Sequence, residues 1–263
     1  MINFENENYS IVVDEKKGCV KSLVQGDKDY IFKENPLFVL RFRNKDGSFY
    51  DVDTYSMNLV SSLEKKDEAK ILYEAKDNSF SAELCITFRE NMEWKINVKN
   101  NTDLVLENVD FALIVPKDLV ADGGKSKVLW GFNEGVLVDN IDNRKDVFGF
   151  LEFGYPGVGL MPVFPAIVET QFMAYFDGIH GLYLATHDTE GNIKAIDFYP
   201  EDGGIKLYFR LLTNSDFGCD FSMEYLFVMQ MFSGEWQVAA DIYSCLLYTS
   251  FLHIDLLLED VKL

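Results

Sequence analysis

The sequence has few cysteines, and they are scattered. Cys19, Cys85, Cys219 and Cys245 lie far apart along the 263 residues, with no C-x-x-C pair and no histidine at ligand spacing. Such spacing gives neither a disulfide framework nor a zinc site. We therefore expect reduced, structural cysteines and no bound metal.

Long apolar runs and basic residues are also scarce. No stretch reaches the roughly eighteen apolar residues of a membrane helix, and residues 1–13 lack the basic and apolar segments of a secretory signal. We expect a cytoplasmic protein that contacts no membrane. Lys and Arg number 24 against 43 Asp and Glu, a formal charge of −19. A field of this sign repels nucleic acid and favours neutral over acidic carbohydrates as partners.

Linear catalytic motifs are missing. The sequence contains no G-x-S-x-G, no phosphate-cradling glycine loop and no H-E-x-x-H, which excludes the commonest motif-defined hydrolases, nucleotide-binding proteins and metalloproteases. His180 and His187 flank the segment GLYLATH, and we favour a structural role for both over a mutarotase-like acid and base pair. The sequence thus predicts no catalytic residue and no cofactor.

Apolar residues, by contrast, are abundant and alternate with polar ones. They make up 48% of the chain, and the alternation over 82–88 and 92–98 predicts a hairpin with a turn at 89–91. Many short strands of this kind predict an all-β fold, one large two-sheet antiparallel sandwich. Further strands are predicted at 9–13, 19–25, 37–43, 69–76, 108–115, 172–176, 181–187, 193–199, 205–211 and 219–231.

The pattern changes after the last strand. Ser233 can cap a helix and Glu235 suits its positive first turn, so a short C-terminal helix is predicted near Gly234. The residues predicted to share its buried face are Trp236, Ala239, Ala240 and Tyr243.

These patterns divide the chain into a sandwich at 1–232, the start of a linker helix at 233–244 and a tail at 245–263. The tail fits neither element, and its first six residues, CLLYTS, look like translated adapter sequence. We expect it to be non-native. A native apolar helix from Leu246 to Leu258 is the alternative.

The segment 130–170 mixes aromatic residues with glycine and proline, unlike an ordinary polar loop. Aromatic rings stack on the apolar side of a sugar while amides and carboxylates bind its hydroxyls. The candidate contacts to a carbohydrate or to a neighbouring domain are Trp130, Phe132, Glu134, Tyr155 and Gln171. Internal packing is the alternative for these side chains.

Three stretches resemble the galactose mutarotase-like supersandwich that precedes a TIM barrel in bacterial glycoside hydrolases. They are GYPG at 154–157, QFMAYFDGIHGLYLATHDTEGNIK at 171–194 and GEWQVAADIY at 234–243. The resemblance implies a supersandwich that leans on the barrel, and catalytic carboxylates supplied by that barrel. A barrel takes on the order of 250 residues, so we expect this chain to lack it.

The expected function is therefore that of a non-catalytic accessory domain, which supports the catalytic barrel of the same chain and contacts a neutral carbohydrate. Two alternatives remain open. One is a self-sufficient sugar epimerase, mutarotase or polysaccharide lyase on the same fold, and the other is a stand-alone carbohydrate-binding module.

Overall fold

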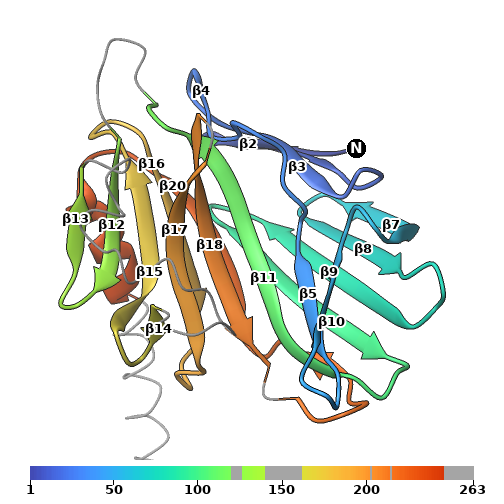
Figure 1. Cartoon of the computed structure of the whole chain (residues 1–263). Coiled ribbons are helices and arrows are strands. Elements are labelled where there is room, and N and C mark those ends of the chain that lie inside the picture. Colours follow the sequence, from blue (N-terminus) through green and yellow to red (C-terminus); the bar gives the residue numbers. More distant parts are fainter. Residues whose placement is uncertain (120–125, 140–161, 202, 214, 246–263) are drawn as a thin grey trace, which may run out of the picture.

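Alternating apolar and polar residues build three antiparallel sheets, two of which face each other (Figure 1). The computed structural model describes residues 1–119, 126–139, 162–201, 203–213 and 215–245. No helix within these ranges is long and apolar enough to cross a membrane.

The largest sheet has ten strands, in the order β13-β12-β15-β16-β20-β10-β9-β8-β7, with β19 pairing with β10. Its strands are β7 (Asn58–Lys65), β8 (Glu68–Glu74), β9 (Phe80–Phe88), β10 (Met92–Asn100), β12 (Lys127–Phe132), β13 (Val136–Val138), β15 (Val168–Phe176), β16 (Gly181–His187), β19 (Phe221–Ser222) and β20 (Leu226–Phe232).

A six-stranded sheet lies over it, in the order β14-β17-β18-β11-β5-β6 (Figure 1). Its strands are β5 (Val39–Arg43), β6 (Phe49–Asp53), β11 (Val105–Pro116), β14 (Val163–Phe164), β17 (Lys194–Glu201) and β18 (Gly204–Leu212). The third sheet contains β1 (Ile2–Glu5), β2 (Ser10–Asp14), β3 (Cys19–Gln25) and β4 (Lys28–Asp29).

The main core fills the space between the two large sheets. Every second side chain of a strand points inward, as the period of a strand requires. Phe111 of β11 stacks on Phe227 of β20 with ring centroids 5.0 Å apart, and meets Trp94 of β10 edge-on at 6.5 Å. These aromatic contacts join the two layers.

A helix at 236–245 packs on the outer face of the ten-stranded sheet, behind β12 and β15 in Figure 1. It buries Ala239 and Tyr243 against Phe172 and other outward-facing residues of β15, β16 and β20. The predicted C-terminal helix is thus confirmed, with one correction: Trp236 is 39% exposed. It therefore does not share the buried face.

The all-β sandwich fold is confirmed, and the predicted hairpin of β9 and β10 pairs Phe88 with Met92 across its turn. Several details differ from expectation. The predicted strand at 219–231 is divided into β19 and β20. The segment 130–170, where no strand was predicted, contains the end of β12, the short strands β13 and β14 and the start of β15, and neither β6 nor β7 was predicted. The domain boundary at 232 remains a prediction, and the tail after residue 245 lies outside the described residues.

Candidate functional site

Two of the predicted contact residues, Trp130 and Phe132 of β12, lie inside the sandwich. Their rings stack with centroids 4.7 Å apart, and Trp130 has no exposed surface. The indole Nε1 donates a hydrogen bond to the Ile196 carbonyl of β17 at 2.7 Å. Trp130 therefore links the two large sheets, and its ring is not open to a sugar.

The other candidates do not join them on one surface. Glu134 is exposed in the turn after β12, where its φ of 71° is in the left-handed region. Gln171 on β15 is only 5% exposed and points into a buried polar cluster. Tyr155 lies outside the described residues.

That cluster is centred on Lys194, the first residue of β17, which is fully buried. Its Nζ donates hydrogen bonds to Gln171 Oε1 and to Asp188 Oδ2, each at 2.6 Å. Thr186 also donates to Gln171 Oε1, at 3.1 Å. Asp188 in turn accepts from the backbone N and the Nδ2 of Asn192. The cluster thus connects β15 and β16 of one sheet with β17 of the other.

The electrostatics of this cluster favour a charged pair. Burial by itself raises the pKa of Asp188, but the Lys194 ammonium and the N–H groups of Asn192 outweigh it and hold the pKa below its usual value. Burial lowers the pKa of Lys194, and Asp188 opposes that effect. The rings of Phe164 and Tyr225 lie 5.0 and 4.9 Å from Nζ, close enough for cation–π attraction. An enclosed lysine that bonds to two side chains is a structural cross-link and not an accessible nucleophile.

The two described histidines are both half-buried, and they have different partners. His180 belongs to the turn before β16, where its backbone N donates to Asp177 Oδ1 at 2.7 Å and its Nδ1 lies 3.5 Å from Asp177 Oδ2. His187 ends β16 with its Nε2 3.5 Å from the Tyr183 hydroxyl, and burial lowers its pKa to about 4. His187 is therefore neutral at pH 7.

The outer face of the six-stranded sheet carries a second polar network, which the sequence analysis missed. Arg210 of β18 binds Asp110 of β11 through two hydrogen bonds, of 3.0 and 2.9 Å. Tyr208 and Asn108 also donate to this carboxylate, at 3.0 and 2.7 Å. Burial lowers the pKa of Arg210, but Asp110 outweighs that effect and raises it. All four side chains are largely buried on a face that could have been open to water.

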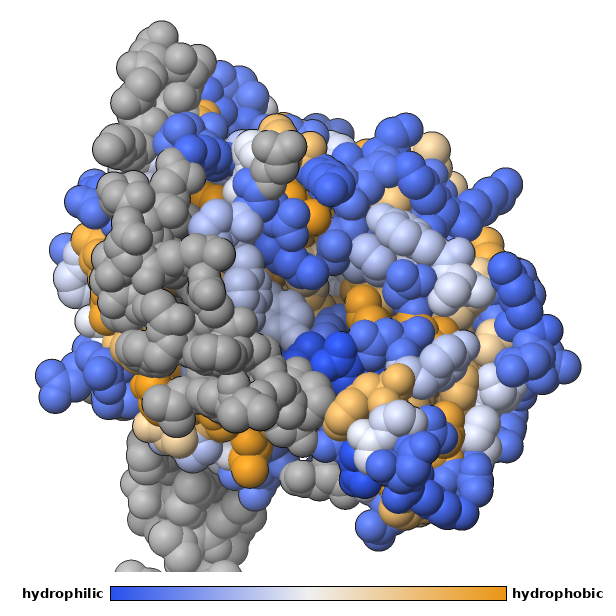
Figure 2. Space-filling model, viewed as in Figure 1, coloured by the Kyte–Doolittle hydropathy of each residue, from blue (hydrophilic) through white to orange (hydrophobic). Residues whose placement is uncertain are grey.

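The network continues toward the edge of the same sheet. Arg41 binds Asp51 through two hydrogen bonds of 2.7 Å, and Arg43 binds Glu107 at 2.8 Å. The Arg41 guanidinium lies over the ring of Phe49, which is 38% exposed, at 5.7 Å. Figure 2 shows hydrophilic and hydrophobic residues side by side on this side of the molecule. We call Arg41, Asp51, Asp110, Tyr208 and Arg210 the polar face.

The donors and acceptors of the polar face bind one another. Its guanidinium and phenol groups donate hydrogen bonds, its carboxylates accept them, and aromatic rings such as Phe49 and Phe217 are partly open beside them. Within the described ranges, no group of three or more His, Cys, Asp or Glu residues could hold a metal ion.

Comparison with known proteins places the fold. No model of a known protein family matches the sequence, and no curated protein matches it. Several solved structures match in shape. The fold is that of a galactose mutarotase-like sandwich.

An α-N-acetylgalactosaminidase from Bifidobacterium bifidum matches with a TM-score of 0.59 and 12% identity, over 92% of this chain and 38% of the enzyme. A galactose mutarotase-like protein from Lactobacillus casei matches with a TM-score of 0.53 and 9% identity, over 89% of this chain and 99% of that protein. A GH36 α-galactosidase from Geobacillus stearothermophilus matches with a TM-score of 0.52 and 8% identity, over 89% of this chain and 40% of the enzyme. The chain therefore spans less than half of the length of the two glycosidases.

Proposed function

We propose that this chain is a non-catalytic accessory sandwich of a carbohydrate-active protein, and that it works beside a separate catalytic barrel. The observation that supports this most is the state of the outer face of the ten-stranded sheet. The helix at 236–245 covers that face over β15 and β16, and His187 at the end of β16 is half-buried beside Tyr183 with a lowered pKa. An epimerase or a glycosidase instead needs an exposed acid and base beside its sugar.

The same proposal gives the polar face a role in contacting a neutral carbohydrate. The charge of −19 disfavours acidic glycans, and a surface of paired charges and partly open rings suits a polyhydroxyl partner. If the isolated chain binds such a glycan, it is also a binding module in its own right. If it does not, the sandwich serves the barrel by support alone.

A stand-alone sugar epimerase is the second candidate. It is favoured by one observation: the Lactobacillus casei mutarotase-like protein is matched over 99% of its own length. A sandwich of this size therefore also occurs without a barrel.

One experiment separates the two candidates. The purified chain is mixed with the pure α-anomers of galactose, glucose and N-acetylgalactosamine, and their interconversion is followed by polarimetry at pH 7. The accessory role predicts the buffer rate with every sugar, and no hydrolysis of neutral aryl glycosides. Catalysis that His187→Asn abolishes and His180→Asn leaves intact would establish the epimerase instead.

The carbohydrate contact is tested separately by titrating neutral oligosaccharides and following binding by calorimetry. We expect Phe49→Ala and Phe217→Ala to weaken any binding at least several-fold. Val60→Ala serves as the control, because Val60 is similarly exposed, at 51%, but lies on β7 at the far edge of the other sheet. Equal loss in all three variants would remove the polar face from the proposal.

A further inference from the structure

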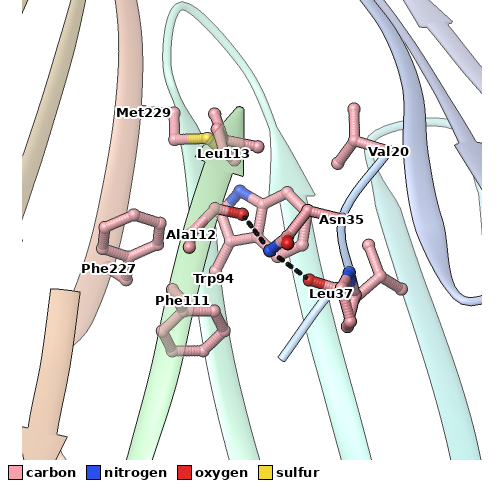
Figure 3. Close-up of a pocket in the computed structure, with 10 residues that line it drawn as sticks. Val20, Asn35, Leu37, Trp94, Phe111, Ala112, Leu113, Phe227 and Met229 are labelled. Atoms are coloured by element: carbon pink, nitrogen blue, oxygen red, sulfur yellow. Dashed lines mark hydrogen bonds between the residues drawn. The ribbon is translucent and has the colours of Figure 1, made fainter. Parts of the chain in front are cut away.

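A small cavity lies between the two large sheets, where the loop before β5 meets β11 (Figure 3). Its volume is about 20 Å³, and its walls include Trp94 of β10, Met229 of β20 and Leu113 of β11. No ionisable side chain lines it. The cavity is therefore uncharged, and mostly apolar.

One polar group of its wall is unsatisfied. Trp94 is 2% exposed, and its Nε1 is a buried donor with no hydrogen-bond partner among the described residues. A buried N–H without a partner is rare, since leaving it unbonded costs the full desolvation of the group. Trp130 shows the usual arrangement, because its Nε1 donates to a carbonyl at 2.7 Å.

Two further residues of the wall, Asn35 and Ala112, carry acceptors. β11 pairs with β5 as far as Asp110 and Val39. Beyond that point no residue of β5 lies opposite β11, and the Asn35 side chain bonds to β11 instead. Asn35 Nδ2 donates to the Ala112 carbonyl at 3.1 Å, and no described residue donates to its Oδ1. Figure 3 shows the Asn35 side chain beside the Trp94 indole, with the Ala112 carbonyl close by.

We propose that this cavity binds a single water molecule, which accepts a hydrogen bond from Trp94 Nε1 and donates to Asn35 Oδ1 and the Ala112 carbonyl. A water needs roughly 10–15 Å³ and two to four polar partners. The cavity offers about 20 Å³ and three such partners, which is too little room for a sugar or a buffer ion. The water joins the ten-stranded sheet to the loop that closes the sandwich beside β11.

The three tryptophans make the test internally controlled. In a ¹⁵N-labelled chain, magnetisation transfer from water to each indole N–H is measured. The Trp94 indole should show a direct cross-peak of the sign of a long-lived bound water. The Trp130 indole, bonded to protein, should show none, and the 39%-exposed Trp236 should show fast exchange with bulk solvent. Trp236→Phe and Trp94→Phe assign the signals.

A second variant tests the acceptor. Asn35→Leu keeps the size of the side chain and removes Oδ1, so the Trp94 cross-peak should be lost, whereas exposed Asn101→Leu should keep it. If Asn35→Leu does not fold, the wild-type spectrum and a crystal structure better than about 2 Å decide. A Trp94 indole without a water cross-peak, or a cavity without electron density, overturns the proposal and leaves Trp94 bonded directly to Ala112 or unbonded.

Discussion

The buried pair of Lys194 and Asp188 gives the sharpest test of how the two large sheets are held together. We expect Lys194→Met, which keeps the unbranched apolar stem of the side chain but not its charge, to destabilise the fold strongly. The change leaves the Asp188 carboxylate, whose side chain is 2% exposed, without its cation. It also removes a donor to Gln171 Oε1.

The magnitude follows from the partners that remain. Removing one member of a buried ion pair costs about 3–5 kcal/mol. Asp188 keeps three donors, which are the backbone N of Glu190 and the backbone N and side-chain Nδ2 of Asn192. We therefore expect a cost at the lower end of this range, about 3 kcal/mol. In a domain of this size each kcal/mol lowers the thermal midpoint by about 2–4 °C, which gives a loss of about 6–12 °C.

Thermal unfolding at pH 7, followed by circular dichroism, measures the effect. Lys99→Met on β10 is the control, because Lys99 is exposed, and its midpoint should stay within about 1 °C of wild type. In the double variant, Asp188→Asn removes the carboxylate charge that Lys194→Met leaves without a cation. The double variant should therefore recover about half of the lost thermal midpoint. A drop below about 2 °C in the single variant, or a larger drop in the double variant, would refute this account of the cluster.

Three further predictions concern other contacts. The pKa of His187 is about 4 in the folded chain and about 6.5 when unfolded, so the unfolded state binds more protons in between. Stability should fall by about 2–3 kcal/mol as pH drops from 6.5 to 4, and denaturant titrations of His187→Asn should lack this slope. Gly181→Ala should cost about 1–3 kcal/mol in the same assay, because a Cβ there would lie 2.2 Å from the Phe232 ring. Trp130→Phe removes the donor to the Ile196 carbonyl and should lower stability by about 1–3 kcal/mol, whereas Trp236→Phe should change little.

The sequence predicts those strands whose two faces differ. Over β9 and β10 each buried residue is followed by a half-buried or exposed one, so alternation alone indicates both strands and their hairpin. β7 was missed because it is exposed along almost its whole length and has no apolar alternation to detect. β12 was missed because Trp130, Gly131 and Phe132 are buried in succession.

Apolar alternation does not predict the polar clusters, because their members come from distant parts of the sequence. Asp110 and Arg210 are 100 positions apart, and they meet only because β11 and β18 pair in a register that places them opposite each other. No local pattern encodes that register. Lys194 did leave a signal, since it is two and four positions from Ile196 and Phe198, which face the main core, and so lies on the same face of β17. A lysine on the same face of a strand as core residues indicates a buried cation.

The two outer faces hold their polar side chains in fixed positions. On the polar face, the carboxylates of Asp110 and Asp51 are each held in position by two hydrogen bonds from an arginine, and the hydrogen bonds from Arg41 lower the pKa of Asp51. A general acid needs the reverse, a carboxyl group whose pKa is raised toward neutrality. On the ten-stranded sheet, the half-buried His187 lies beside Tyr183, and burial lowers its pKa to about 4. Side chains held so firmly fit the proposed accessory role, because a rigid sheet face loses little entropy when a partner binds to it.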